Sequence, residues 1–253
     1  MTEPQFEVRL AQDAQDLQAA QRLRYSVFVQ ELGGGGDLVD HHAGLERDRF
    51  DEHCDHMILI DRAKHSRDHV VGVYRLMQRP HAKAAGQFYS ADEYDLTPLL
   101  KTDRKLLELG RSCLLPDYRG GTAMYHLWNG LAAYVARHEI EILFGVASFH
   151  GTDISVLAPS LALLHHRHLA PPELRVRSRA FQRMDLVEEG ALDRRNAMLE
   201  VPALIKAYLR LGGVVGEGAF VDHAFNTTDI CLIMDTARMN AKYRGIYDRA
   251  GRI

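Results

Sequence analysis

The order of apolar patterns along the chain predicts a single α/β domain built on a mixed β-sheet with flanking helices. Short apolar or alternating segments, typical of strands, are interspersed with segments whose apolar residues recur every three or four positions, typical of helices. No internal repeat or long linker divides the 253 residues. We therefore expect one domain over residues 1–253, with a less regular part from about residue 170 onward.

The expected elements begin with a strand over Phe6–Leu10 and a helix that Asp13 can cap. We expect that helix to continue to about Leu32, where a run of glycines ends it, and a long irregular loop to follow. The remaining expected elements are a hairpin of Met57–Asp61 and Val70–Met77, strands over Lys105–Leu115, Ile142–Ala147, Arg175–Arg179, Val214–Val221 and Ile230–Met234, and helices over Thr97–Leu100, Thr122–His138, Asp153–His168 and Pro202–Leu211, with a polar helix from Asn240.

Composition and sequence patterns argue against a nucleic-acid-binding, secreted or membrane-spanning protein. Apolar residues make up 46 % of the chain and the net charge is −3, with no block of Lys and Arg, which argues against nucleic acid as the main partner. The N-terminal residues lack the pattern of a signal peptide, and no apolar run has the length of a membrane span. We expect a cytoplasmic protein, with peripheral contact at the inner membrane left open.

Cysteine and histidine patterns point to neither disulfides nor metal. The three cysteines form no CxxC pair, so we expect reduced buried thiols. The fourteen histidines form no HExxH or Cys/His zinc pattern, and we expect no metal site.

The stretch LELGRSCLLPDYRGG, residues 107–121, carries the clearest chemical signal. Glu108 and Arg111 stand three apart on an apolar strand, so period-two alternation would send them to opposite faces. A β-bulge at Gly110 would bring them to one face and leave backbone groups free for a ligand. The alternatives are an isolated buried ion pair or an edge strand that exposes both charges.

The same stretch ends in Arg119, Gly120 and Gly121, directly before a helix. Such a turn can aim several backbone N–H groups at one anion, and Arg119 can add a charge. A plain turn is the alternative interpretation.

Two more groups of residues precede this strand. Arg24 and Phe28 share a helix face at a spacing of four residues. Asp48 and Asp51 lie in a loop rich in acidic residues, where clustered carboxylates could attract an amine or simply be solvated.

Taken in order, these features resemble the GNAT acyltransferases, whose fold has a bulged fourth strand followed by a glycine turn into a helix. The glycine turn matches only in part. The resemblance is closer to the acyl-homoserine-lactone autoinducer synthases, in the features Arg24…Phe28, Asp48…Asp51, Arg75 and Glu108…Arg111. It is closest to the bacterial L-ornithine Nα-acyltransferases, through segments that include LRYSVFVQELG, RFDEHCDHMILID, ELGRSC and DYRGG.

The resemblance implies transfer of a 3-hydroxyacyl group from acyl carrier protein to the α-amine of L-ornithine, without a permanently bound cofactor. The co-substrate would be the acyl-phosphopantetheine of the carrier protein. We expect Glu108 to be the base and Arg111 to orient it or to hold a substrate carboxylate. Substrate binding would involve Arg24, Phe28, Asp48, Asp51 and Arg75, the two aspartates either binding the ammonium group or ordering their loop.

The acyl donor would meet the end of the strand. Backbone N–H groups of Ser112, Cys113 and Leu114 would polarise the thioester carbonyl, and Arg119, Gly120 and Gly121 would bind the phosphate. We expect Cys113 to serve packing rather than to carry an acyl group. Two other functions remain open: acylation of another amine from carrier protein or coenzyme A, and a non-catalytic module that binds acyl chains or carrier protein.

Overall fold

The computed structural model describes residues 3–36, 39–66 and 68–239, which form two compact units. Unit 1 comprises the described residues of Met1–Gly86 together with Leu109–Glu139, and unit 2 comprises Gln87–Glu108 and the described residues from Ile140 onward. Strand β7 (Leu106–Leu114) passes from unit 2 to unit 1 after Glu108. The expectation of a single domain stays a prediction.

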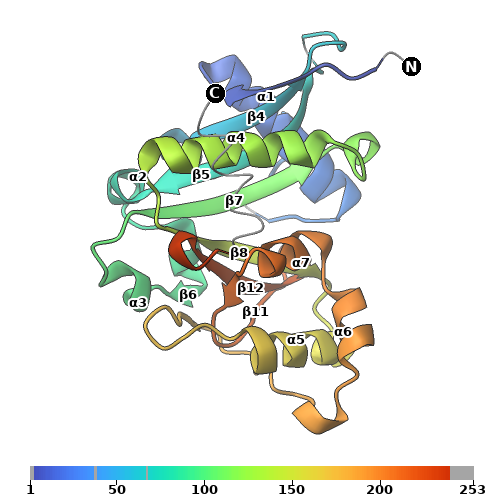
Figure 1. Ribbon diagram of the computed structural model, residues 1–253. Coiled ribbons are helices and arrows are strands. Elements are labelled where there is room, and N and C mark those ends of the chain that lie inside the picture. Colours follow the sequence, from blue (N-terminus) through green and yellow to red (C-terminus); the bar gives the residue numbers. More distant parts are fainter. Residues whose placement is uncertain (1–2, 37–38, 67, 240–253) are drawn as a thin grey trace. The chain divides into compact units, whose positions relative to one another are not determined.

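Unit 1 is a sheet with a helix on each face (Figure 1). The strand order is β1 (Phe6–Leu10), β4 (Asp55–Asp61), β5 (Val70–Gln78) and then β7, and β4 is antiparallel to both β1 and β5. The helices are α1 (Ala14–Arg24) and α4 (Ala123–His138), with the short α2 (Arg79–Ala85) after β5. The smaller elements are β2 (Val39–Asp40), β3 (Leu45–Glu46) and 3-10 turns at Asp51–His53 and Pro116–Tyr118.

Strand β4 is apolar on both faces because each face is covered by a helix. Ile58 and Ile60 belong to a buried cluster with Ala20 and Leu23 of α1. The alternate residue Met57 lies on the α4 side, where its sulfur is 3.1 Å from the position that a Cβ of Gly130 would occupy. The continuous apolar run of β4 therefore follows from burial on two sides.

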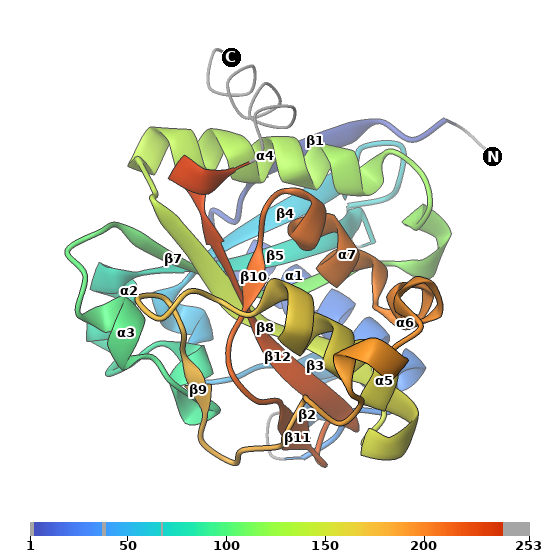
Figure 2. The ribbon, with the colours of Figure 1, turned by 60° about the horizontal axis from the view of Figure 1, so that its bottom comes forward.

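Unit 2 contains the parallel part of the fold. The first residues of β7 pair in parallel with β8 (Ile142–His150), and β8 is antiparallel to β12 (Thr227–Asp235), which also pairs with β10 (Val214–Val215) and β11 (Phe220–Asp222). Helices α5 (Ile154–His168) and α6 (Arg194–Glu200) lie side by side (Figure 2). The other elements are α3 (Thr97–Leu100), α7 (Ala203–Arg210), the pair β6 (Tyr94–Asp95) and β9 (Arg177–Ser178), and 3-10 turns at Tyr89–Asp92, Glu189–Ala191 and Thr236–Arg238.

Most of the expected elements are present, and the differences have local causes. The first helix is α-helical only to Arg24, and Tyr25–Glu31 forms a π-helical segment, η1, that the periodicity did not reveal. The strand expected over Val214–Val221 is divided into β10 and β11, and the sequence analysis did not predict the short helices α2 and α6. The helix expected from Asn240 lies outside the described residues.

The irregularity in β7 is real, but it lies one residue beyond the expected position. Arg111 has a φ of +52°, a left-handed conformation, whereas Gly110 does not have a positive φ. A Cβ at Gly110 would meet only Arg75 Nε, at 3.9 Å, so the glycine is not sterically required. The parallel ladder with β8 covers Leu106–Glu108, before this point.

Close packing of α4 on β1 depends on Gly130, and this gives a test of the fold. A Cβ at Gly130 would lie 2.5 Å from Val8 Cγ1. Although Ala favours a helix by about 1 kcal/mol over Gly, we expect Gly130→Ala to lower the free energy of unfolding by about 1–3 kcal/mol through overpacking. Urea denaturation measures this, and Val8→Ala in the same chain should restore part of the loss. A Gly130→Ala protein that is more stable than the wild type would contradict the described packing.

Candidate active site

A network of buried charges connects the end of α1 with the loop that follows it. The side chain of Arg24 is fully buried and forms ion pairs with Glu46 and with Asp51, the latter over 2.8 Å. Arg24 therefore connects two separate points of the loop to one helix end.

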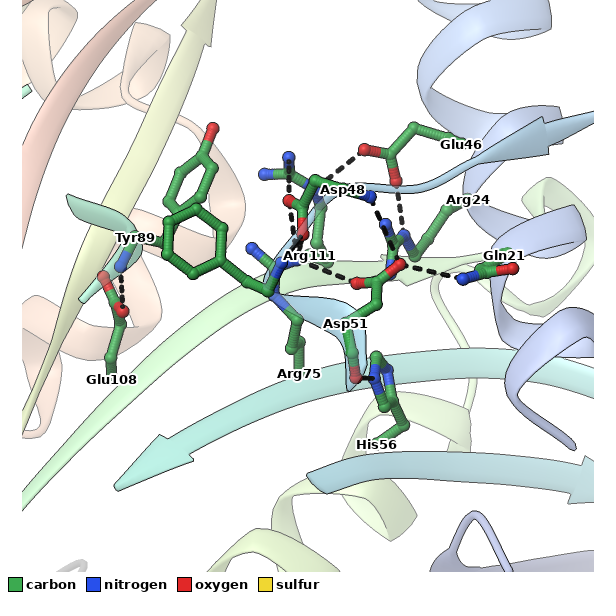
Figure 3. Close-up of polar contacts among 11 residues, drawn as sticks. Gln21, Arg24, Glu46, Asp48, Asp51, His56, Arg75, Tyr89, Glu108 and Arg111 are labelled. Atoms are coloured by element: carbon green, nitrogen blue, oxygen red, sulfur yellow. Dashed lines mark hydrogen bonds and ion pairs between the residues drawn. The ribbon is translucent and has the colours of Figure 1, made fainter. Parts of the chain in front are cut away.

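Two further arginines, from β5 and β7, complete the network (Figure 3). Arg75 Nη1 donates to Asp48 Oδ1 over 2.6 Å and to Asp51 Oδ1 over 2.9 Å. Arg111 donates from Nε to Glu46 Oε1 over 3.0 Å and from Nη2 to Asp48 Oδ2 over 3.1 Å. The three guanidinium groups and three carboxylates thus connect α1, β5 and β7 with the loop, and their formal charges sum to zero.

Two neutral side chains also donate hydrogen bonds to Asp51. Gln21 Nε2 donates to Asp51 Oδ2, and His56 Nε2 donates to the carbonyl of Asp51, each over 2.9 Å. We did not identify either residue, nor Glu46, from the sequence. Gln21 lies three residues before Arg24 on the same helix face, which was an available signal, whereas the placement of His56 opposite Arg75 follows only from the strand register.

The electrostatics favour a structural role for the two aspartates. Burial alone would raise the pKa of Asp51, but Arg24 and Arg75 outweigh burial and lower it. Burial likewise opposes, and Arg75 and Arg111 produce, the lowered pKa of Asp48. Because arginines already neutralise both carboxylates, this arrangement supports the alternative in which they order the loop rather than bind the substrate ammonium group.

Phe28 lies within η1, four residues beyond Arg24 but no longer on a regular α-helix. The N–H of Leu32 donates to the carbonyl of Val27, a π-type bond over 3.1 Å. Phe28 is partly buried against the apolar cluster of α1, β4 and β5. Its described contacts are those of packing, and its role toward a substrate stays a prediction.

Glu108 is a buried carboxylate, 3 % exposed, in unit 2. Its Oε2 accepts a hydrogen bond from Tyr89 N over 2.8 Å and its Oε1 accepts one from Ser90 N over 2.6 Å (Figure 3). These two amides belong to the turn Tyr89–Asp92 and fix the plane of the carboxylate. Because a carboxylate has about four acceptor positions, two amides do not exhaust its capacity.

The expected pairing of Glu108 with Arg111 stays a prediction, because the two residues belong to different units. Arg111 is paired with Glu46 and Asp48, and Glu108 is bound by backbone amides. Arg111 has a left-handed φ, one residue after the glycine at which we expected the bulge. Each of the two charges thus has described partners within its own unit.

The end of β7 provides the residues expected to meet the acyl donor. Burial raises the pKa of the Cys113 thiol to about 12, so thiolate is scarce at neutral pH, which supports the expected packing role. The hydroxyl oxygen of Ser112 is buried and makes no hydrogen bond within the described chain. Leu114 is buried, and its carbonyl accepts hydrogen bonds from Arg119.

Arg119 stands between the turn Pro116–Tyr118 and the glycine pair. It forms a two-pronged pair with Glu31, from Nη1 over 2.5 Å and from Nη2 over 2.8 Å. Gly120 has a φ of +76°, and a Cβ at either Gly120 or Gly121 would meet nothing within 4 Å. The turn is therefore open, as an anion site would require, while its arginine is held by a carboxylate of the chain.

The described residues contain no group of three or more His, Cys, Asp or Glu side chains that could hold a metal ion. Among the described helices, none combines the length and the apolar character needed to cross a membrane. Helix α7 buries Ile205, Tyr208 and Leu209 within the chain, and Leu204 is half-buried, as expected of a packed helix.

Comparison with known proteins gives the class and the family. Residues 23–129 match the acetyltransferase (GNAT) domain. An N-acyl amino acid synthase from uncultured soil microbes superposes with a TM-score of 0.55 at 11 % identity, covering 93 % of this chain and 94 % of its own. A CoA-dependent acyl-homoserine lactone synthase superposes with a TM-score of 0.50 at 15 % identity, covering 94 % and 83 %. At these identities the likeness shows the fold, and the chain has the GNAT fold.

Two sequence relatives narrow this class. The L-ornithine Nα-acyltransferase of Rhodobacter capsulatus is 61 % identical over 96 % of this chain and 95 % of its own length. That of Brucella abortus is 42 % identical over 96 % and 88 %. The chain belongs to the L-ornithine Nα-acyltransferase family.

Removal of one charged side chain from the network should lower the free energy of unfolding. We expect Arg24→Met to lower the free energy of unfolding by about 3–5 kcal/mol, because Glu46 and Asp51 would stay buried without compensation. Arg22→Met, an exposed position on the same helix, should change it by less than about 0.5 kcal/mol. Denaturant unfolding of both variants provides the measurement, and equal effects would contradict the network.

Titration of His56 should make the stability of the fold depend on pH at values above those at which Asp48 and Asp51 titrate. Burial lowers the pKa of His56 below the ordinary 6.5, so below about pH 6.5 the unfolded chain binds a proton that the folded chain does not. The free energy of unfolding should therefore decrease as the pH is lowered through this range. Asp48 and Asp51, whose pKa values are also lowered, reduce it only below about pH 4.

His56→Gln keeps an N–H donor but cannot titrate, so its free energy of unfolding should fall less between pH 7 and 5 (on the order of one titrating group). Unfolding measured across this range provides the test, with His150→Gln, at an exposed position, as the control. The same slope in His56→Gln and the wild type would show that His56 does not contribute.

Proposed function

We propose that this protein transfers a 3-hydroxyacyl group from the phosphopantetheine thioester of acyl carrier protein to the α-amine of L-ornithine. The observation that carries the proposal is the near full-length identity of 61 % to an L-ornithine Nα-acyltransferase. The buried Glu108, fixed by two amides, supports a reaction that needs a positioned base.

In the proposed reaction, Glu108 accepts a proton from the α-ammonium group, directly or through a water molecule. The amine then attacks the thioester carbon, a C–N bond forms, the C–S bond breaks, and the thiol of phosphopantetheine leaves with a proton. Backbone N–H groups and the hydroxyl of Ser112 near the end of β7 would stabilise the oxyanion. The high pKa of Cys113 supports direct transfer without an acyl-enzyme.

Arg111 is the candidate for binding the carboxylate of the amino acid. Its side chain is 11 % exposed, compared with none for Arg24 and 3 % for Arg75, so it is the most accessible cation of the network. Glu46 and Asp48 would hold its guanidinium in a fixed orientation. Arg24 and Arg75 would act indirectly, through the loop that they hold.

The reaction itself can be tested with purified components. The protein is incubated with 3-hydroxyacyl carrier protein, or with the matching acyl-CoA, and a panel of amino acids, and products are identified by mass spectrometry. We expect acylornithine from the carrier-protein donor. Product only from acyl-CoA would overturn the assigned donor, and product only with another amino acid would overturn the assigned acceptor.

Glu108→Gln should lower kcat by about 100- to 10,000-fold, because the amide cannot accept the proton. The remaining rate should rise with pH, as more of the substrate amine is already neutral. Glu108→Ala should regain activity with added formate if the carboxylate is the base. Loss of activity without recovery by pH or formate would instead assign Glu108 to holding the Tyr89–Ser90 turn, and full activity would exclude both roles.

A further inference from the structure

The guanidinium group of Arg119 is already bound by a carboxylate of the chain. Both prongs of Arg119 contact Glu31, the last residue of η1, over 2.5 and 2.8 Å. Carboxylates and phosphates use the same two-pronged geometry with arginine. Glu31 therefore occupies the position on Arg119 that a phosphate oxygen would take.

Arg119 does not depend on Glu31 for its placement. Its Nε and Nη2 also donate to the carbonyl of Leu114, over 3.1 and 2.9 Å. The pair with Glu31 is partly open to solvent, with 42 % of the arginine and 33 % of the glutamate side chain exposed. An anion arriving from solvent could thus displace Glu31 while Leu114 keeps the guanidinium group in place.

The charges around this turn do not favour a strongly anionic ligand. Arg119 is the only Lys or Arg between Pro116 and Trp128, and Asp117 adds a negative charge two residues before it. Arg119 lowers the pKa of Glu31, chiefly through the side-chain hydrogen bond, so Glu31 stays charged at neutral pH. The nearby cation Lys64 stands over the ring of Tyr118, next to the buried Asp61.

We propose that Glu31 is a specificity-determining residue of the donor site, which competes with the donor phosphate for Arg119 and thereby selects against coenzyme A. Coenzyme A presents several phosphate groups and relies on them for affinity. A carrier protein presents a single phosphodiester and adds its own protein surface. Pairing of Arg119 with Glu31 should therefore weaken the binding of coenzyme A more than the binding of acyl carrier protein. This inference rests on the proposed function for the identity of the preferred donor.

The first experiment measures binding alone. Isothermal calorimetry with coenzyme A compares the wild type, Glu31→Gln and Glu7→Gln, the last of which breaks another exposed pair, with Arg62, and changes the net charge equally. We expect Glu31→Gln to bind coenzyme A about fivefold more tightly, since an exposed ion pair no longer competes, and Glu7→Gln to match the wild type. The gain should shrink as salt concentration rises.

The second experiment measures turnover. The ratio of kcat/KM for acyl-CoA to that for acyl carrier protein should rise about fivefold in Glu31→Gln. Unchanged or weaker coenzyme A binding, an unchanged ratio, or an equal effect of Glu7→Gln would overturn the role of Glu31. If the wild type accepts no acyl group from carrier protein, the proposed donor is wrong, and the binding comparison still decides whether Glu31 competes for Arg119.

Discussion

Mutual neutralisation of Arg24, Arg75 and Arg111 by Glu46, Asp48 and Asp51 is the constraint on which unit 1 depends. Charges that are removed from water are tolerated only when each has partners in good geometry. An apolar cluster could hold the same elements together, but it would not specify which part of the loop meets which strand. The network therefore gives the loop after α1 a unique position relative to α1, β5 and β7.

The sequence allowed much of this to be predicted, and the limits have physical reasons. Periodicity located α4 and α5 because each has several turns and an apolar face, and it located β4 and β5 because both are buried runs. The order of charged residues indicated the members of the network except Glu46. Their pairing could not be deduced, since it depends on the left-handed backbone at Arg111 and on the π-helical turn after Arg24, neither of which has a period of its own.

Glu108 and Arg111, the two expected catalytic residues, are bound by different kinds of group. Glu108 accepts hydrogen bonds from the backbone amides of Tyr89 and Ser90. Arg111 is held by carboxylates from the loop. The two residues are three positions apart on β7. A change in the loop that removed Glu46 or Asp48 would therefore take hydrogen bonds away from Arg111.

The backbone conformation of Arg111 has a consequence for how this position can vary among related chains. A φ of +52° costs most residues about 1–3 kcal/mol, and β-branched side chains tolerate it least. Glycine would relieve the strain but remove the charge that Glu46 and Asp48 require. Lysine would keep a charge but not the planar fork that reaches both. Two constraints therefore limit replacement of Arg111. The backbone conformation disfavours β-branched residues, and the buried carboxylates disfavour neutral ones.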